Sequence, residues 1–186
     1  MQTIMPSQLK RGMVLMVDGA PLLIEDAYHV GAAQAKPKTH ARMRNLHTGR
    51  LMERTIADNE HLTTAELQAR QVQFSYQQGE GFVFLDATTF DELDLTAQQV
   101  GERHWFLKEN EEYKALFLDG NLLDIELPDH VAMRVAETPA AQRSAQQSTY
   151  KEAKLEGGLE IKVPLFIAPA DVVRVDTRSR KYVGKE

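Results

Sequence analysis

The densest group of residues that could bind a ligand is a run of cations. Five Lys/Arg residues fall within positions 36–50, and no Asp or Glu interrupts them. They are Lys36, Lys38, Arg42, Arg44 and Arg50. Such a run is typical of a surface that contacts RNA phosphates. The alternative is a solvated hairpin whose cations only keep it soluble, and charge alone leaves both interpretations open.

The residues that usually perform catalysis or bind metals do not form a recognisable set. The six histidines lack the His-x-x-x-His spacing of a helical metal site and lie in separate predicted elements. The chain has no cysteine, which excludes disulfides, thiolate metal sites and cysteine nucleophiles. Adjacent carboxylates such as Asp91 and Glu92 indicate a solvated turn instead of an acid–base pair. We therefore expect no metal, no cofactor and no enzymatic activity.

Charge is distributed unevenly along the 186 residues, whose formal net charge is −5. Positions 1–63 carry eight Lys/Arg against six Asp/Glu, a balance of +2, so the remainder of the chain holds −7. A nucleic-acid contact is therefore expected in the amino-terminal third. No run approaches the roughly 20 apolar residues that cross a bilayer, and residues 1–11 lack the apolar centre of a secretory signal. We expect a cytoplasmic protein that does not contact membranes.

The elements that must position the cations are short strands. The run 13–17 leads into Asp18-Gly19, a favoured two-residue hairpin turn, and Asp119-Gly120 marks a second turn. A longer hairpin goes out over 24–30, has a polar tip at 31–39 and returns over 40–46. One or two short helices between Thr96 and Leu107 are expected to plug the middle barrel. Many short strands with Gly-rich turns predict a mostly β chain of small barrels, with domain boundaries near residues 64 and 128.

Three groups of residues resemble signatures of the elongation factor P family, in the family's order and spacing. In the first third these are Leu9-Lys10-Arg11-Gly12-Met13 and Arg44-Asn45-Leu46-His47-Thr48-Gly49. In the middle and last thirds they are Gly81-Phe82-Val83-Phe84-Leu85-Asp86, Ile161-Lys162-Val163-Pro164-Leu165-Phe166 and Val175-Asp176-Thr177-Arg178-Ser179-Arg180-Lys181-Tyr182-Val183. The resemblance implies an SH3-like, KOW-type domain at 1–64 with a functional hairpin at 30–40. Two OB-fold domains at 65–128 and 129–186 complete a tRNA-shaped molecule.

The same resemblance implies a function in translation. Members of this family bind the 70S ribosome between the peptidyl and exit sites and contact peptidyl-tRNA and ribosomal RNA. They restore peptide-bond formation when consecutive prolines stall the ribosome. Proline has a fixed φ and is a poor nucleophile, so a factor that only holds the acceptor end in place can speed the reaction. The expected protein is a non-enzymatic, monomeric translation factor.

The functional hairpin departs from the family pattern at its tip. The family commonly has a modified lysine or arginine there, and the ungapped count places Gln34 at that position. An unmodified Gln34 would act through its amide, and a two-residue shift of the loop would bring Lys36 to the tip instead. Lys38, Arg42 and Arg44 are expected to contact RNA phosphates, with Arg42 and Arg44 on one strand face.

A second departure lies in the third domain, where the family's Gly-Asp-Thr loop near the exit-site codon is replaced by Arg143-Ser144-Ala145. Arg143 and Ser144 are the candidate residues for that loop, and the two departures together indicate a paralogous branch. Two other functions stay open. One is an OB-fold RNA-binding protein with no role in peptide-bond formation, against which the acidity of 64–186 counts. The other is an enzyme acting on tRNA, for which no nucleophile stands out.

Overall fold

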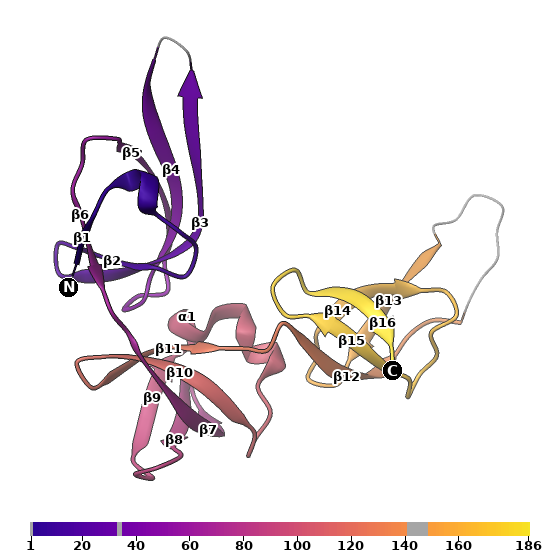
Figure 1. The fold of residues 1–186 in the computed structure, drawn as a ribbon. Helices are drawn as coiled ribbons and strands as arrows, with labels where there is room; N and C mark the ends of the chain where they lie inside the picture. The colour runs from indigo at the N-terminus through magenta and orange to yellow at the C-terminus, as the bar shows by residue number, and fades with distance from the viewer. Residues whose placement is uncertain (1, 33–34, 141–148) are drawn as a thin grey trace. The chain divides into compact units, whose positions relative to one another are not determined.

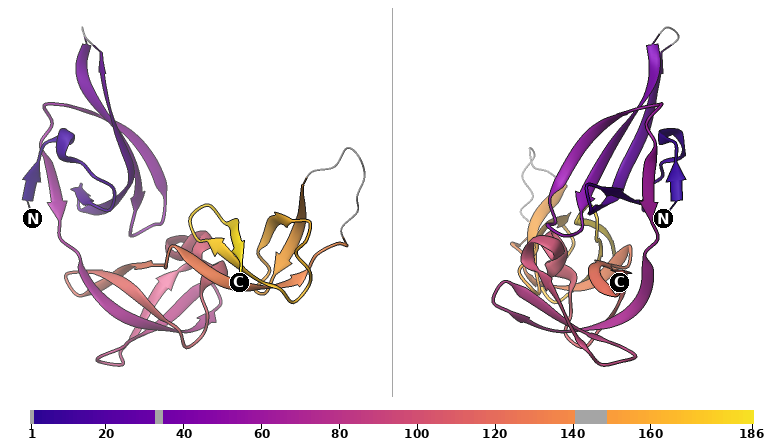
Figure 2. Two further views of the ribbon diagram at one scale, coloured as in Figure 1. Left: turned by 45° about the vertical axis from the view of Figure 1, so that its right-hand side comes forward. Right: turned by 90° about the vertical axis from the view of Figure 1, so that its left-hand side faces the viewer.

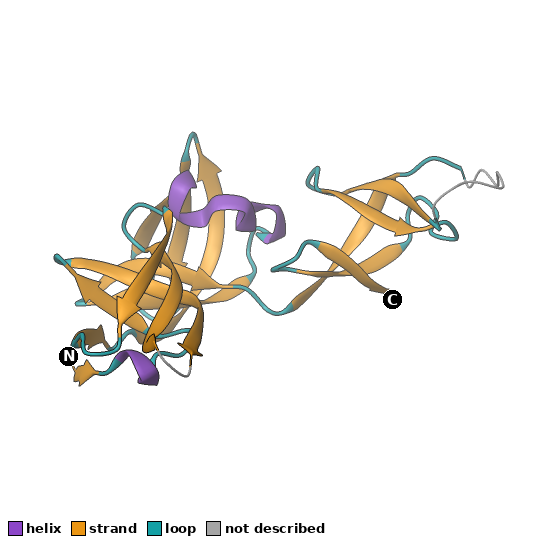
Figure 3. Ribbon diagram, turned by 90° about the horizontal axis from the view of Figure 1, so that it is seen from above, coloured by secondary structure: helices purple, strands orange, loops and turns teal. Residues whose placement is uncertain are grey.

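The computed structural model describes residues 2–32, 35–140 and 149–186, with side chains of 32 and 35–37 left out. Strands make up most of this part of the chain, and helix is confined to short segments (Figure 3). The strands form three curled sheets, which draw on 2–65, 68–126 and 130–185 (Figure 1). The prediction of a mostly β chain built from small barrels is confirmed.

The first sheet has six strands in the order β1-β6-β2-β3-β4-β5. The strands are β1 (Gln2–Ile4), β2 (Val14–Val17), β3 (Ala20–Ala32), β4 (Ala35–Asn45), β5 (Leu51–Ala57) and β6 (Leu62–Ala65), with the 3-10 helix η1 (Pro6–Gln8) after β1. Asp18 and Gly19 join β2 to β3 with φ of 50° and 80°. Two consecutive positive φ values match the twist of the flanking strands, which confirms the predicted hairpin turn.

Apolar side chains that alternate along β2, β3 and β4 fill the first barrel. Its buried cluster comprises Ile4, Leu9, Leu15, Leu22, Ile24, Ala41, Met43, Ile56 and Leu62. In β4 the odd-numbered residues 39, 41 and 43 are buried, and residue 42 between them is exposed. A period of two in burial is the signature of a strand with one face on a core. The even-numbered side chains of β4 therefore face outward.

The second sheet has five strands in the order β11-β10-β7-β8-β9. They are β7 (Gln68–Gln78), β8 (Gly81–Asp86), β9 (Glu92–Thr96), β10 (Glu112–Leu118) and β11 (Asn121–Glu126). The helix α1 (Ala97–Val100) follows β9, and Thr96 caps it by accepting from the backbone N–H of Gln99. Asp119 and Gly120 turn β10 into β11 with φ of 50° and 85°, as the sequence predicts.

The third sheet has the order β14-β13-β12-β15-β16. Its strands are β12 (His130–Glu137), β13 (Tyr150–Leu155), β14 (Glu160–Pro164), β15 (Val172–Asp176) and β16 (Lys181–Lys185). The 3-10 helix η2 (Gly101–Phe106) supplies Phe106 to the buried cluster of this barrel, and Trp105 packs against the same cluster. The prediction that Thr96 to Leu107 plugs the middle barrel is therefore wrong for these two aromatic residues.

Contacts divide the chain into two compact units. The first comprises 1–101 and 108–126, and thus both of the first two barrels. The second comprises 102–107 and 127–186. The boundaries near 64 and 128 stay a prediction, because the contacts group the first two sheets together.

Candidate nucleic-acid interface

The hairpin of β3 and β4 extends beyond the other strands of the first barrel (Figures 1 and 2). Tyr28 pairs with His40, Val30 with Lys38, and Ala32 with Ala35. Strand pairing thus runs through most of 31–39. The prediction of a polar tip over this whole range is therefore wrong. A β-bulge sets Gly31 opposite both Lys36 and Pro37. Because the bulge already interrupts the hydrogen bonds between the strands, β4 can contain Pro37, which has no backbone N–H to donate.

Several predicted contact residues cannot be located at the level of side chains. Gln34 lies outside the described residues, and so do Arg143 and Ser144. Lys36 belongs to β4, and only its backbone is described. Their assigned roles remain predictions, and the structural argument rests on the stem of the hairpin.

Lys38 and Arg42 are exposed on the outward face of β4. The two residues differ in their neighbours across the sheet. Lys38 is paired with Val30 and Ala57, whereas Arg42 is flanked by Asp26 and Glu53. The cationic run is therefore free of acids along the chain but not across the strands. Positive charge on this face is least compensated near Lys38, toward the tip.

An aromatic pair lies between these two cations on the outward face. The rings of Tyr28 and His40 are stacked, with centroids 5.1 Å apart and planes 16° from parallel. The hydroxyl of Thr55 lies 3.0 Å from Nδ1 of His40. On the opposite face, Nδ1 of His29 lies 2.8 Å from the hydroxyl of the buried Thr39. Hydrogen bonds thus fix the orientation of His40 and His29 on the hairpin stem.

Arg44 continues the outward face of β4 but is held by two carboxylates of the same chain. Its Nε lies 2.8 Å from Oε1 of Glu25, and Nη2 lies 2.8 Å from Oδ2 of Asp124. Burial alone would lower the pKa of Arg44, but the charge and hydrogen bonds of Asp124 and Glu25 outweigh burial and raise it. The exposed fractions are 14% for the Arg44 side chain and 2% for that of Asp124. Arg44 therefore joins the first barrel to β11.

The residues after Arg44 complete this joint between the first two barrels. Oδ1 of Asn45 accepts from the backbone N–H groups of His47 and Thr48, at 2.9 and 3.1 Å. Gly49 follows with φ of 72°, and a Cβ added there would lie 1.9 Å from the carbonyl oxygen of Gln98. Nε2 of Gln99 donates to the carbonyl oxygen of Leu46 at 3.0 Å. Leu46 and Gly49 thus lie against α1.

A small apolar cluster lies beneath these polar contacts. It comprises Val14, Leu46 and Ala65 together with Leu123 of β11. Sequence reasoning missed the joint because its partners are far apart in the chain. One signal was available: Asp124 interrupts the apolar run 122–125, and a buried acid needs a partner.

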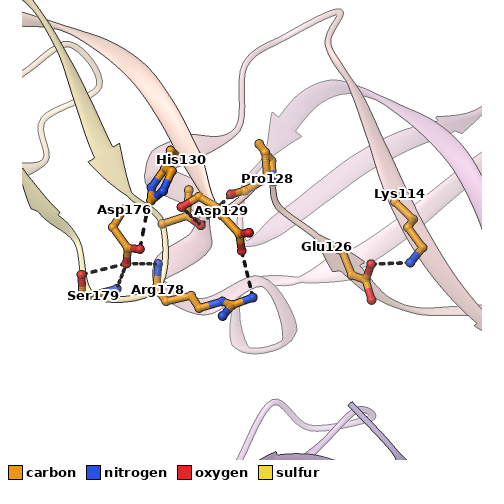
Figure 4. Close-up of polar contacts among 9 residues, drawn as sticks. Lys114, Glu126, Pro128, Asp129, His130, Asp176, Arg178 and Ser179 are labelled. Atoms are coloured by element: carbon orange, nitrogen blue, oxygen red, sulfur yellow. Dashed lines mark hydrogen bonds and ion pairs between the residues drawn. The ribbon is translucent and has the colours of Figure 1, made fainter. Parts of the chain in front are cut away.

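In the second unit, the residues from 176 to 179 form a capped turn (Figure 4). Oδ1 of Asp176 accepts from the backbone N–H of Ser179 at 2.6 Å and from its hydroxyl at 2.7 Å. The hydroxyl of Thr177 donates to the carbonyl oxygen of Pro128 at 2.7 Å, and Arg178 pairs with Asp129 at 2.9 Å. The carboxyl-terminal signature thereby ties the β15–β16 turn to the start of β12.

Comparison with known proteins identifies the family to which the chain belongs. Three family models match in order: the elongation factor P KOW-like domain over 6–62, its OB domain over 67–125, and the elongation factor P carboxyl-terminal domain over 131–185. Elongation factor P of Synechococcus sp. (strain JA-3-3Ab) is 36% identical over 181 residues, 97% of this chain and 98% of that protein. That of Dictyoglomus thermophilum is 37% identical over 175 residues, 94% of this chain and 95% of that protein. The chain belongs to the elongation factor P family.

A solved structure agrees with this assignment at the level of the fold. The translation initiation factor 5A from Methanococcus jannaschii superposes with a TM-score of 0.50 and 17% identity, covering 67% of this chain and 94% of that one. The KOW-like and OB domains expected from the elongation factor P signatures are thus confirmed. Membership makes the chain a translation elongation factor.

Each shifted pKa in the described part of the chain has a structural explanation. Backbone N–H groups of Thr88 and Thr89 lower the pKa of Asp86 at a turn, and Lys185 lowers that of Asp171. Burial raises the pKa of Tyr113, whose hydroxyl accepts from the backbone N–H of Lys108.

Among residues 2–32, 35–140 and 149–186, no three His, Asp or Glu gather as metal ligands. Within the same ranges, no helix has the length and apolarity to cross a membrane.

Acid is expected to weaken the second unit through Asp176. Hydrogen bonds from Ser179 lower the pKa of Asp176, so their stabilisation is present above the unfolded pKa and is lost as the pH falls through the folded one. Because the pKa of an unfolded Asp is about 3.9, this stabilisation is expected to be lost below about pH 4. Trp105, the single tryptophan, packs in this unit, and its fluorescence reports unfolding there. Asp176→Asn should lower stability at pH 7 and flatten the acid dependence, and an unchanged dependence would contradict this role.

Proposed function

We propose that this chain binds the 70S ribosome between the peptidyl and exit sites and promotes peptide-bond formation at consecutive prolines by positioning peptidyl-tRNA. Family membership supports the class of function. The observation that carries the proposal is the hairpin of β3 and β4, which extends from the barrel and bears Lys38 and Arg42 outward. A paired stem with both cations on one face is suited to address an RNA backbone.

The proposed action is positioning without chemistry. A misplacement of about 1 Å between reacting groups can cost on the order of a hundredfold in rate. A protein contact that restores the geometry of the peptidyl ester can therefore speed the reaction with proline. Under this proposal Gln34 or Lys36 contacts the acceptor end, while Arg143 and Ser144 lie near the exit-site codon. The protein acts in the cytoplasm as a monomer without catalytic residues of its own.

The decisive test is reconstituted translation of a messenger that encodes three consecutive prolines. Purified protein should speed full-length synthesis on this messenger and leave an otherwise identical messenger with three alanines unaffected. Gln34→Ala should weaken the rescue with little change in melting temperature, because the role proposed for Gln34 is a contact with tRNA. No rescue by the wild-type protein, together with no co-sedimentation with ribosomes, would overturn the proposal.

The phosphate contacts predict a change in salt dependence. Each neutralised phosphate contributes about one unit to the slope of log affinity against log salt concentration. Lys38→Ala should therefore weaken ribosome binding and reduce that slope by about one unit. Arg42→Ala should have a smaller effect, because Asp26 and Glu53 flank Arg42 and partly compensate its charge. An unchanged slope for both variants would favour the solvated-hairpin interpretation.

A further inference from the structure

The aromatic pair of Tyr28 and His40 on the hairpin stem leaves much of the Tyr28 ring open to solvent. Tyr28 is 58% exposed although one face of its ring is stacked on His40. Both residues stand on the outward face of the sheet, away from the buried cluster of the first barrel. A large aromatic side chain left open to solvent on a protruding element is available to a partner.

The pair is held in place by three neighbouring strands. His40 of β4 is paired with Tyr28 of β3 on one side and with Thr55 of β5 on the other. The contact of Thr55 with Nδ1 fixes the imidazole plane, and the imidazole in turn supports the phenol ring. A ring that is ordered before binding loses little conformational entropy when a second ring stacks on it.

Charge around the pair favours a polyanion that approaches from the tip side. Lys38 lies two residues from His40 on the same strand face, and its partners across the sheet, Val30 and Ala57, are uncharged. At the other side of the pair, Asp26 and Glu53 flank Arg42. A phosphate is thus attracted beside Lys38 and meets carboxylates toward the barrel.

We propose that Tyr28 and His40 form a stacking platform for one unpaired RNA base, whose phosphate is contacted by Lys38. Single-stranded RNA is commonly recognised by bases stacked on aromatic side chains, with cations along the backbone. Duplex RNA presents no free base faces and would not use the platform. The inference rests on the proposed function for the source of the RNA, which is the RNA that the hairpin meets on the ribosome.

The first test compares variants in their affinity for ribosomes stalled at consecutive prolines. Tyr28→Val keeps a residue that favours strands and removes the ring, and it should weaken binding about tenfold. Tyr28→Phe keeps the ring and should bind within about twofold of wild type. The salt slope should stay unchanged in both, because stacking releases no counterions. Val30→Thr, on the same strand and face, is the matched control and should bind as wild type does.

If Tyr28→Val binds as tightly as Val30→Thr while both melt like the wild type, the ring of Tyr28 makes no contact with RNA and the platform is overturned. A second measurement does not depend on the ribosome or on rescue. Carbon-13 NMR should show ring-current shifts at Tyr28 and His40 when the full-length protein is titrated with hexaadenylate, and not with an RNA duplex of the same strand length. The absence of such shifts at millimolar hexaadenylate would overturn the platform even where rescue succeeds. Shifts without rescue would uphold the platform and count against the proposed function.

Discussion

Gly49→Ala is expected to destabilise the first unit by about 3 to 5 kcal/mol. Gly49 has φ of 72°, a conformation that costs a residue with a Cβ about 1 to 2 kcal/mol. The added Cβ would also lie 1.9 Å from the carbonyl oxygen of Gln98 and 2.5 Å from its carbonyl carbon. Because these are backbone atoms of α1, the joint between the barrels must open to admit the methyl group.

Gly12→Ala is the matched control for the backbone part of this effect. Gly12 has φ of 85°, and a Cβ added there meets nothing within 4 Å. Urea unfolding followed by far-ultraviolet circular dichroism should show a loss of about 1 to 2 kcal/mol for Gly12→Ala. Trp105 belongs to the second unit, so its fluorescence transition should stay in place in both variants. Equal losses at Gly12 and Gly49 would contradict the steric role of Gly49.

Local features of the fold could be predicted from the sequence, because short-range chemistry determines them. Asp18-Gly19 and Asp119-Gly120 form the expected turns, since both residues of each pair adopt the positive φ that these types tolerate. The outward face shared by Arg42 and Arg44 follows from the period of two along a strand. The strand content and the barrel class needed no more than such patterns and the family signatures.

The candidate site was less predictable, because its electrostatics depend on pairing between strands. The cationic run appeared free of acids along the chain, yet strand register sets Asp26 and Glu53 beside Arg42. Trp105 and Phe106 lie next to the middle barrel in sequence, yet they pack in the third. Neither register nor the choice of core is encoded in local composition, so both needed the folded structure.

Arg44→Met is expected to destabilise the first unit by about 3 to 5 kcal/mol, the usual cost of breaking a buried ion pair from one side. The substitution leaves Asp124 buried with its guanidinium partner removed. Arg54→Met is the matched control, since Arg54 pairs with Glu60 at a similar distance of 2.7 Å but with 44% of the Arg54 side chain exposed. Because solvent screens such a pair, its loss should cost less than about 1 kcal/mol. Urea unfolding of both variants measures the difference, and similar losses would contradict the buried joint.

A double variant separates the two roles that Arg44 could have, in the joint and as a phosphate ligand. Arg44→Met combined with Asp124→Leu removes both charges, and replacement of a buried pair by apolar residues is often neutral or stabilising. If Arg44 acts only in the joint, the double variant should regain most of the lost stability, bind ribosomes with wild-type affinity and keep the wild-type salt slope. If Arg44 also contacts a phosphate, stability should return while the slope falls by about one unit. Because the guanidinium already meets Glu25 and Asp124, we expect the first outcome, with salt-dependent binding carried by Lys38 and, more weakly, Arg42.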